Sequence, residues 1–456
     1  AHPDTQNPPG QLSPVMSTTK KAKTSTTRTL LVYLGDTGLE VGELQFSRQG
    51  QKEVSAFRYS PAWLSNPDCF ALSPDLPLST DFQYRAGSKE TSTFAGAIAD
   101  TEPDGWGRRV IDRANAKRRK AEKDAGRDAG SAQLSDLDYL LGVLDSSRIG
   151  ALRFRDNADS PFLDVPHDDN LPEGTHEVPL QTLIQASKAV ESGKDTATDL
   201  AYLKGRGTSL GGMRPKATVL KPDGTLTIAK FPSVSDTRDV VRGEVLALLL
   251  AKEAGLNASE AEVVMAGAQA VALIVRFDRP RAGGRIPYLS AASLLQLDSR
   301  EDGAYTQIAE AIDRFSPRPL ADKQELWARI CFSMLITNVD DHMHNHGFLH
   351  SGGGQWRLAP LFDVNPFPDK EPVLKTAVTE ATGETGDILE ALEAAAYFGV
   401  SDDDAHVILT RMMAALSDWK RIARSPAVGM NDDEIDKVAP AFENDNWDAV
   451  ASFLEQ

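Results

Sequence analysis

Residues 338–345 read Asn-Val-Asp-Asp-His-Met-His-Asn, and residues 361–364 read Leu-Phe-Asp-Val. The first segment follows a run at 327–335 that is apolar on nearly every side, as the sequence of a buried helix is. A hairpin is expected between the two segments, around a Ser-Gly-Gly-Gly turn. The pattern offers an acid (Asp340), an amide (Asn345) and a second acid (Asp363). Carboxylate and amide oxygens suit Mg²⁺, and a carboxylate can also act as a base.

An upstream region predicts a small sheet that carries one helix. Alternating polarity puts Leu226, Ile228 and Lys230 on one face of a strand. A lysine on an apolar face needs an anionic partner, and Glu244, on the same side of a following helix as several valines, is the candidate. The expected order is strand, strand, helix, strand, strand, as in the small lobe of a protein kinase: residues 218–221, 225–231, 239–254, 263–265 and 270–275.

These residues match the needs of phosphoryl transfer, in which charge on a nucleotide is neutralised and a hydroxyl is oriented. Lys230 is expected to contact the phosphates while Glu244 holds its ammonium in place. Asn345 and Asp363 are expected to coordinate Mg²⁺. Asp340 is expected to orient or deprotonate the attacking hydroxyl. Each residue alone is a weak signal, and their order and spacing carry the prediction.

Two other kinds of site were weighed against a kinase. Four of the 8 histidines fall close together, which raises the possibility of a zinc site, but no cysteine or regularly spaced carboxylate completes a tetrahedral set: His342, His344, His346 and His350. Residues 207–211, Gly-Thr-Ser-Leu-Gly, match the nucleophile elbow of hydrolases. That elbow requires a strand before the serine and a helix after it, whereas this sequence predicts a helix before and a hairpin after.

The assembled motifs resemble the HipA-type toxin serine/threonine kinases of bacterial toxin-antitoxin systems. Besides the two segments quoted first, the resemblance is carried by Ser-Leu-Gly-Gly-Met-Arg-Pro-Lys-Ala, Ala-Lys-Phe-Pro-Ser and Arg-Phe-Asp-Arg, at residues 209–217, 229–233 and 276–279. It extends from about residue 28 to the C-terminus. The sequence departs from ordinary protein kinases at Val339, where they carry arginine, and at Val364, where they carry Phe-Gly.

The resemblance implies ATP and Mg²⁺ as cofactors and a protein substrate among the aminoacyl-tRNA synthetases, whose modification blocks translation and growth. It adds Arg276, Phe277 and His342 to the nucleotide-binding residues, with adenine bonded by backbone groups near Arg276. It implies autophosphorylation of Ser209, with Thr208 as a second acceptor, and we expect a phosphate there to inactivate the enzyme. A HipB-like helix-turn-helix antitoxin is the implied partner, which would bring operator DNA to the kinase indirectly.

The expected fold is α+β and two-lobed like a protein kinase, with an N-terminal β-rich subdomain, a small lobe of sheet plus helix, and an all-helical C-terminal lobe. Residues 1–27 read as a disordered tail without the apolar core of a signal peptide. The predicted divisions are a HipA-like N-terminal subdomain at 28–155, a small lobe with the Gly-rich loop at 156–285, and a C-terminal lobe with the catalytic loop at 286–456. A catalytically silent co-repressor or binding subunit with the same fold remains the alternative.

Composition and net charge limit the class of protein, its compartment and its direct binding of nucleic acid. The 456 residues include 41% hydrophobic and 25% charged residues, near globular averages, and no apolar run is long enough to span a membrane. Two cysteines, far apart in sequence, suit a reducing cytoplasm. A net charge of -17 argues against binding nucleic acid through the whole surface. The one basic cluster, within 108–123, is interpreted as a solvated helical face, with a partner-facing or DNA-facing patch as the alternative.

Overall fold

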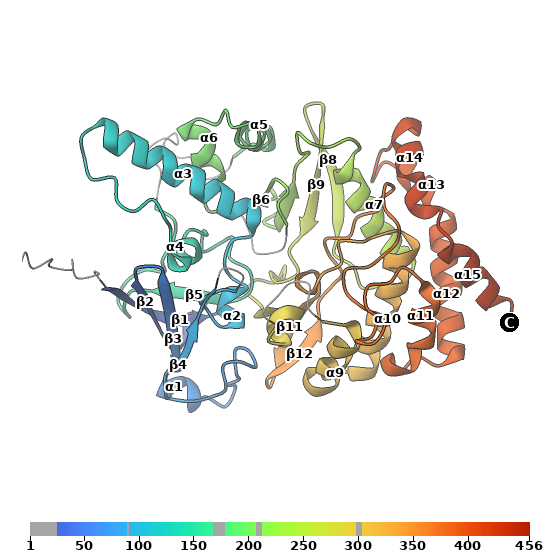
Figure 1. The fold of residues 1–456 in the computed structure, drawn as a ribbon, viewed down its shortest axis with the longest axis horizontal. Helices are drawn as coiled ribbons and strands as arrows, with labels where there is room; N and C mark the ends of the chain where they lie inside the picture. Colours follow the sequence, from blue (N-terminus) through green and yellow to red (C-terminus); the bar gives the residue numbers. More distant parts are fainter. Residues whose placement is uncertain (1–24, 89–90, 167–177, 207–211, 298–302) are drawn as a thin grey trace, which may run out of the picture.

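The computed structural model describes residues 25–88, 91–166, 178–206, 212–297 and 303–456. The predicted tail lies outside these ranges except for residues 25–27, which begin the first strand. Figure 1 shows a blue N-terminal sheet at one end of the long axis, a second sheet near the middle, and the orange and red helices of the C-terminal lobe at the other end.

The N-terminal sheet is antiparallel and has the order β4-β3-β2-β1-β5. Its first two strands form a hairpin, whose turn contains Gly35 and Gly38 at φ +74° and +67°, conformations that glycine adopts without strain. The last strand returns from much later in the sequence to pair with the first. The elements are β1 (Ser25–Leu34), β2 (Leu39–Gln49), β3 (Lys52–Tyr59), α1 (Pro61–Leu64), β4 (Gln83–Ala86), α2 (Gly96–Ala99) and β5 (Leu152–Arg155).

The long basic helix α3 (Gly105–Asp124) joins the N-terminal subdomain to the small lobe, and α4 (Asp136–Leu141) follows it. Asp104 caps α3 by accepting a hydrogen bond from the Gly107 amide at 2.7 Å. Arg113 forms an ion pair with buried Asp195, in the turn between α5 (Leu180–Glu191) and α6 (Ala197–Leu203). Part of the predicted basic cluster therefore docks α3 onto these helices rather than facing solvent.

The small lobe is built around a four-stranded antiparallel sheet with the order β6-β7-β9-β8. Its pattern of strand, strand, helix, strand, strand is the predicted one. Ile228 on β7 packs in an apolar cluster between the lobes, while the next residue, Ala229, packs in a different cluster on the other face of the sheet. The elements are β6 (Lys216–Leu220), β7 (Leu226–Lys230), α7 (Val240–Glu253), β8 (Ala261–Ala266) and β9 (Gln269–Val275).

The C-terminal lobe is mainly helical, and its core is α10 (Pro319–Leu335), which is buried along most of its length. The expectation of an entirely helical lobe is wrong in one respect: β10 (Tyr288–Ser290), β11 (Gly347–Gly352) and β12 (Gln355–Leu358) form a three-stranded sheet. The β11–β12 hairpin was predicted, but β10 is too short to show a periodic pattern. The other elements are α8 (Ala291–Leu294), α9 (Tyr305–Phe315), η1 (Met343–Asn345), α11 (Ile388–Glu393), η2 (Ala395–Phe398), α12 (Asp402–Ser417), α13 (Trp419–Arg424), α14 (Asp432–Val438), η3 (Ala439–Phe442) and α15 (Asn446–Leu454).

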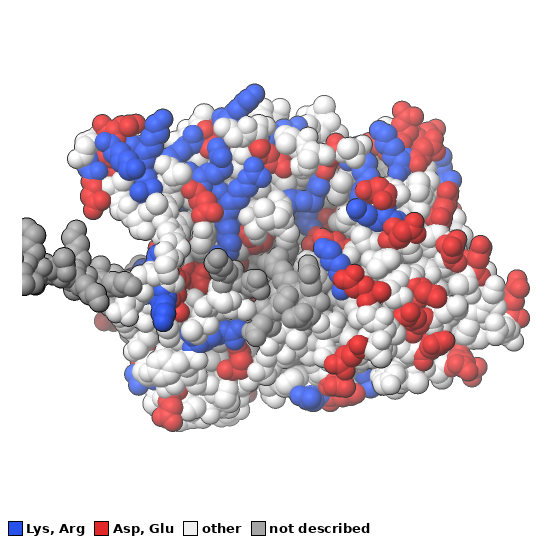
Figure 2. Space-filling model, in the orientation of Figure 1, with Lys and Arg blue, Asp and Glu red and all other residues white. Residues whose placement is uncertain are grey.

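Surface charge is unevenly distributed. Figure 2 shows acidic side chains spread over the helices of the C-terminal lobe and basic side chains gathered around α3 at the other end of the molecule. Within the ranges that the structure describes, no helix is both long and apolar enough to cross a bilayer.

Candidate functional site

The segment predicted as a catalytic loop begins directly after α10, and hydrogen bonds to other segments hold its first residues. Thr337 adopts φ +53°, a left-handed conformation that is costly for a β-branched residue, and its hydroxyl donates to the Ala441 carbonyl at 2.8 Å. The Asn338 amide oxygen accepts from the Asn365 backbone N–H at 3.1 Å. Because Asn365 follows Asp363 closely, this bond fixes the two quoted segments relative to each other.

Asp340 and Asn345 lie at opposite ends of this loop and are joined by a hydrogen bond. The Asn345 side-chain N–H donates to the Asp340 backbone carbonyl at 2.7 Å. The Asp340 carboxylate is half-exposed, at 48%, and forms an ion pair with Lys375 at 2.7 Å. The exposed part of this carboxylate is accessible to a second molecule.

The amide oxygen of Asn345 is buried and has no hydrogen-bond partner among the described residues. Leaving a buried acceptor unsatisfied is costly, so its retention calls for a ligand. A cation would satisfy it. The Asp363 carboxylate, in the segment that the bond between Asn338 and Asn365 fixes to this loop, offers a second hard oxygen donor for Mg²⁺. The residues present therefore fit the predicted metal.

Asp363 lies beside Lys230, whose ammonium is held between two carboxylates. The Lys230 Nζ is 2.6 Å from Glu244 Oε1 and 2.5 Å from Asp363 Oδ1. Asp363 adopts φ +54°, a left-handed conformation that short polar residues tolerate better than others do. The ion pair predicted between Lys230 and Glu244 is present, and it joins β7 to α7.

The charges in this group respond differently to burial. Burial alone would lower the pKa of Lys230, but Asp363 and Glu244 outweigh it and raise this pKa. Burial would raise the pKa of Asp363, but Lys230, Lys216 and His342 hold it below its usual range. Burial keeps the pKa of Glu244 raised despite Lys230. Lys230 and Asp363 are therefore both charged near neutral pH, as phosphate and metal contacts require.

The histidines have separate partners rather than a common centre. The His346 Nε2 lies 2.8 Å from Asp341, and the Tyr305 hydroxyl also bonds that carboxylate. Burial would raise the pKa of Asp341, but His346, Tyr305 and His342 together hold it below its usual range. His350 stacks on Phe70 with ring centroids 3.7 Å apart. The described residues include no group of three or more His, Cys, Asp or Glu side chains placed to hold a metal ion.

Arg276, predicted near the nucleotide, directs its side chain toward the N-terminal subdomain. Its guanidinium pairs with Asp278 at 2.6 Å and donates to the carbonyls of Ser147 and Arg148 at 2.8 and 3.0 Å. Its backbone N–H donates to Leu226. The side chain therefore ties β9 to the N-terminal subdomain. The expected contact of nearby backbone groups with adenine stays a prediction.

Phe277, the neighbouring prediction, faces an apolar cluster between the lobes. Its ring centroid lies 5.4 Å from that of Phe362 and 6.1 Å from that of Tyr288, and Ile228 belongs to the same cluster. Phe362 precedes Asp363, and Ile228 shares a strand face with Lys230. Within this cluster Phe277 is only partly buried, so its ring is the part that could contact a flat apolar group such as a nucleobase.

Ser209 and Thr208 lie outside the described residues, so their predicted modification has no structural account. The flanking elements do test the nucleophile-elbow interpretation. α6 precedes the Gly-rich segment and β6 follows it, the reverse of the strand and helix that the elbow needs. The hydrolase interpretation is therefore excluded by the fold.

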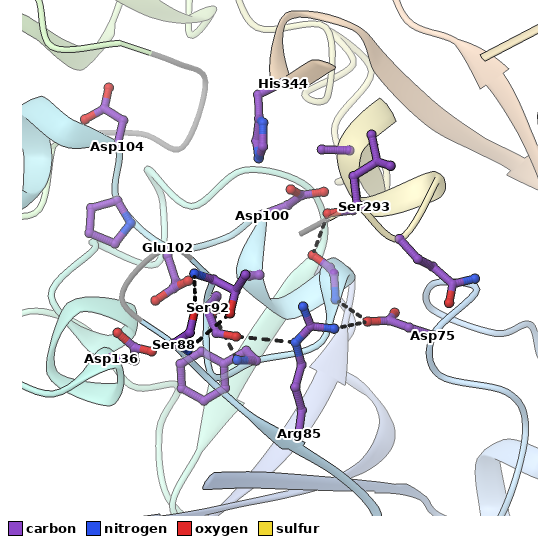
Figure 3. Close-up of a pocket in the computed structure, with 18 of the residues that line it drawn as sticks. Asp75, Arg85, Ser88, Ser92, Asp100, Glu102, Asp104, Asp136, Ser293 and His344 are labelled. Atoms are coloured by element: carbon purple, nitrogen blue, oxygen red, sulfur yellow. Dashed lines mark hydrogen bonds and ion pairs between the residues drawn. The ribbon is translucent and has the colours of Figure 1, made fainter. Parts of the chain in front are cut away.

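A polar cavity of about 400 Å³ opens beside the catalytic loop. Figure 3 shows His344 reaching into it from the loop, with Glu102 and Asp136 on one side and Asp75 with Arg85 on another. Its walls come from the N-terminal subdomain and from α8 with the residues after it. This cavity was not predictable from the sequence, because its lining residues range from Asp75 to His344 along the chain.

Glu102 in this cavity makes stability depend on pH. Burial raises the pKa of Glu102 to about 7, an effect that Arg108, 2.9 Å away, only partly offsets. A raised carboxyl pKa means that the folded chain retains a proton that the unfolded chain has lost, so stability falls as the pH rises from the usual glutamate pKa of 4.5 to about 7 and then levels off.

Glu102→Gln has no proton to lose over this range. As the pH rises from 5 to 8, we expect its free energy of unfolding to increase by about 2 kcal/mol relative to that of the natural chain. Urea unfolding of both proteins at the two pH values measures this difference. A difference that does not change with pH would contradict the assignment.

Comparison with known proteins places these features in a family. A model described as the HipA-like C-terminal domain matches residues 208–419, and one described as the HipA N-terminal domain matches residues 30–127. A Sinorhizobium fredii protein, provisionally described as the kinase Y4mE, is 24% identical over 363 residues, covering 74% of this chain and 77% of its own length. A Haemophilus influenzae protein, also provisionally described as a kinase, is 26% identical over 190 residues, covering 36% of this chain and 55% of its own.

The fold is also found among solved structures. The Shewanella oneidensis MR-1 HipA, solved with HipB and operator DNA, superimposes with a TM-score of 0.61 at 19% identity, over 94% of this chain and 99% of its own. The N-terminal model matches upstream of the C-terminal model, and together the two matches span most of this chain. The chain belongs to the HipA-type kinase family and has its two-lobed, kinase-like fold.

Proposed function

We propose that this protein is a serine/threonine protein kinase that transfers the γ-phosphate of ATP to a serine hydroxyl of a protein substrate. The observation that carries the proposal is the ammonium of Lys230, held at 2.6 Å by Glu244 and at 2.5 Å by Asp363. The apolar cluster around Phe277 supplies a surface for the base, and the half-exposed Asp340 supplies one for the acceptor.

The residues divide the work of an in-line transfer. Lys230 binds phosphate oxygens, and Glu244 keeps its ammonium in place. The acceptor hydroxyl donates a hydrogen bond to Asp340, which receives the proton as the oxygen bonds the γ-phosphorus and the bond from that phosphorus to ADP breaks. Asn345 and Asp363 would hold Mg²⁺, which when bound neutralises charge on the phosphates.

The substrate and partners follow from the family. We propose that an aminoacyl-tRNA synthetase is the target, that its phosphorylation inhibits translation and growth, and that a HipB-like helix-turn-helix antitoxin neutralises the kinase. The Shewanella relative was solved with HipB and operator DNA, which supports such a partner. A net charge of -17 favours DNA contact through a partner over direct binding.

The full chain incubated with γ-labelled ATP and Mg²⁺ tests the proposal. We expect label on Ser209, with Thr208 as a second acceptor, and on a synthetase in an added lysate. Autophosphorylation in the Gly-rich loop should then lower activity, because a phosphate there repels those of ATP. Ser209→Ala is the control, since it should remove most self-labelling and leave substrate labelling.

Nucleotide binding without any transferred label would instead favour a catalytically silent co-repressor. The geometry of Lys230, Asp340 and Asp363 speaks against that alternative, because a subunit that only binds has no need of an accessible base.

A further inference from the structure

A second buried lysine lies beside Lys230 and has no part in the proposed transfer. Lys216 on β6 is the cross-strand partner of Lys230 on β7. Its side chain is 2% exposed and forms an ion pair at 2.7 Å with Asp104, which is 1% exposed. Asp104 comes from the N-terminal subdomain, where it caps α3 at the edge of the cavity in Figure 3.

The start of α3 is bonded to the chain that leaves the Gly-rich loop. The Gly212 carbonyl accepts from Lys216 Nζ at 3.3 Å and from the Trp106 backbone N–H at 3.4 Å. The Trp106 indole N–H donates to the Lys216 carbonyl at 3.0 Å. Gly105 lies so close to Met213 that a Cβ on Gly105 would be 2.2 Å from its sulfur. A side chain at residue 105 would therefore require the Met213 side chain to move.

This contact also reaches the charged centre of the site. Lys216 helps to lower the pKa of Asp363. The pKa of Asp104 is raised by burial and, to a smaller extent, by the negative charge of Asp363. Removing one partner of a fully buried ion pair leaves an unpaired buried charge and strongly destabilises a protein. Lys216 and Asp104 are therefore expected to stay paired in the folded chain.

We propose that Asp104 and Trp106 of the N-terminal subdomain are positioning residues for ATP: through Lys216 they fix Gly212, where the Gly-rich loop joins β6. The inference rests on the proposed kinase function, since the loop matters only if its backbone lies against phosphates. The N-terminal subdomain is then part of the nucleotide site and raises ATP affinity without contacting the nucleotide.

The test uses the full chain with Asp104→Asn combined with Lys216→Met. Asparagine retains an acceptor for the α3 cap, and methionine leaves no unpaired charge. We expect the KM for ATP to rise about tenfold or more while kcat changes less than threefold. Lys216→Arg keeps the ion pair and should stay within about threefold of the natural KM. A matched control is Arg113→Met with Asp195→Asn, which removes an ion pair of the same helix that involves neither Lys216 nor Gly212 and should leave KM unchanged.

Trp106→Phe provides a second variant, because it removes only the indole bond to Lys216 and should raise KM roughly threefold. A natural KM in both the Asp104 and Lys216 double variant and the Trp106 variant would overturn the inference alone. A natural chain that binds no ATP would overturn the proposed function and this inference with it.

Discussion

Asp340→Asn is expected to lower the rate of phosphoryl transfer by about 10² to 10⁴ while leaving ATP affinity unchanged. Asparagine has the shape of aspartate but cannot take a proton from the acceptor hydroxyl. The Asp340 carboxylate is half-exposed, and its ion pair with Lys375 is also on the surface, so little stability depends on it. Initial rates with labelled ATP, together with a nucleotide-binding titration, measure both effects.

Growth gives an independent readout of the same substitution. On the proposed function, expression of the natural chain is expected to arrest cells and expression of the Asp340 variant is not. Asp369→Asn, which replaces an exposed acid in the same lobe, should act as the natural chain is expected to act. Arrest that persists with the Asp340 variant would show that toxicity does not require phosphoryl transfer. Phosphoproteomic comparison of the two cultures would identify the target.

Local patterns in the sequence predicted the elements that carry the site. Alternation along β7 predicted that Ile228 and Lys230 share the face between the lobes, and helical spacing predicted that Glu244 lies opposite. Such predictions are possible because side-chain direction repeats with a fixed period along a strand or a helix. The same reasoning predicted the hairpin of β11 and β12. The motifs resembled those of one family, which implied its two-lobed fold. The family models confirm the family, and the superposition on the Shewanella HipA confirms the fold.

Contacts between distant segments were not predictable in this way. Asp104 and Lys216 are 112 positions apart, and nothing periodic relates a helix cap to a buried strand lysine. Arg276 belonged to a recognised motif, but its side chain turns toward the carbonyls of Ser147 and Arg148, which no motif specifies. The roles of Ser209 and Thr208 stay predictions, since they lie outside the described residues.

Asp363→Asn is expected to reduce phosphoryl transfer by about 10² or more and to raise the Mg²⁺ concentration needed for half-maximal rate. The substitution removes the charge of one of the two hard oxygen donors. Asparagine tolerates the left-handed φ of +54° at this position, so the backbone should not rearrange. Lys230 would still pair with Glu244 at 2.6 Å, which keeps its buried ammonium satisfied.

Glu244→Gln separates the metal effect from the loss of a buried charge. It weakens the hold on Lys230 but removes no proposed metal ligand, so the rate should fall while the Mg²⁺ dependence stays that of the natural chain. Magnesium titrations of both variants at saturating ATP make the comparison. An unchanged midpoint for the Asp363 variant would remove Asp363 from the metal site and leave its contact with Lys230, at 2.5 Å, as its main role. A shifted midpoint for the Glu244 variant would mean that the ion pair and the metal site are not independent.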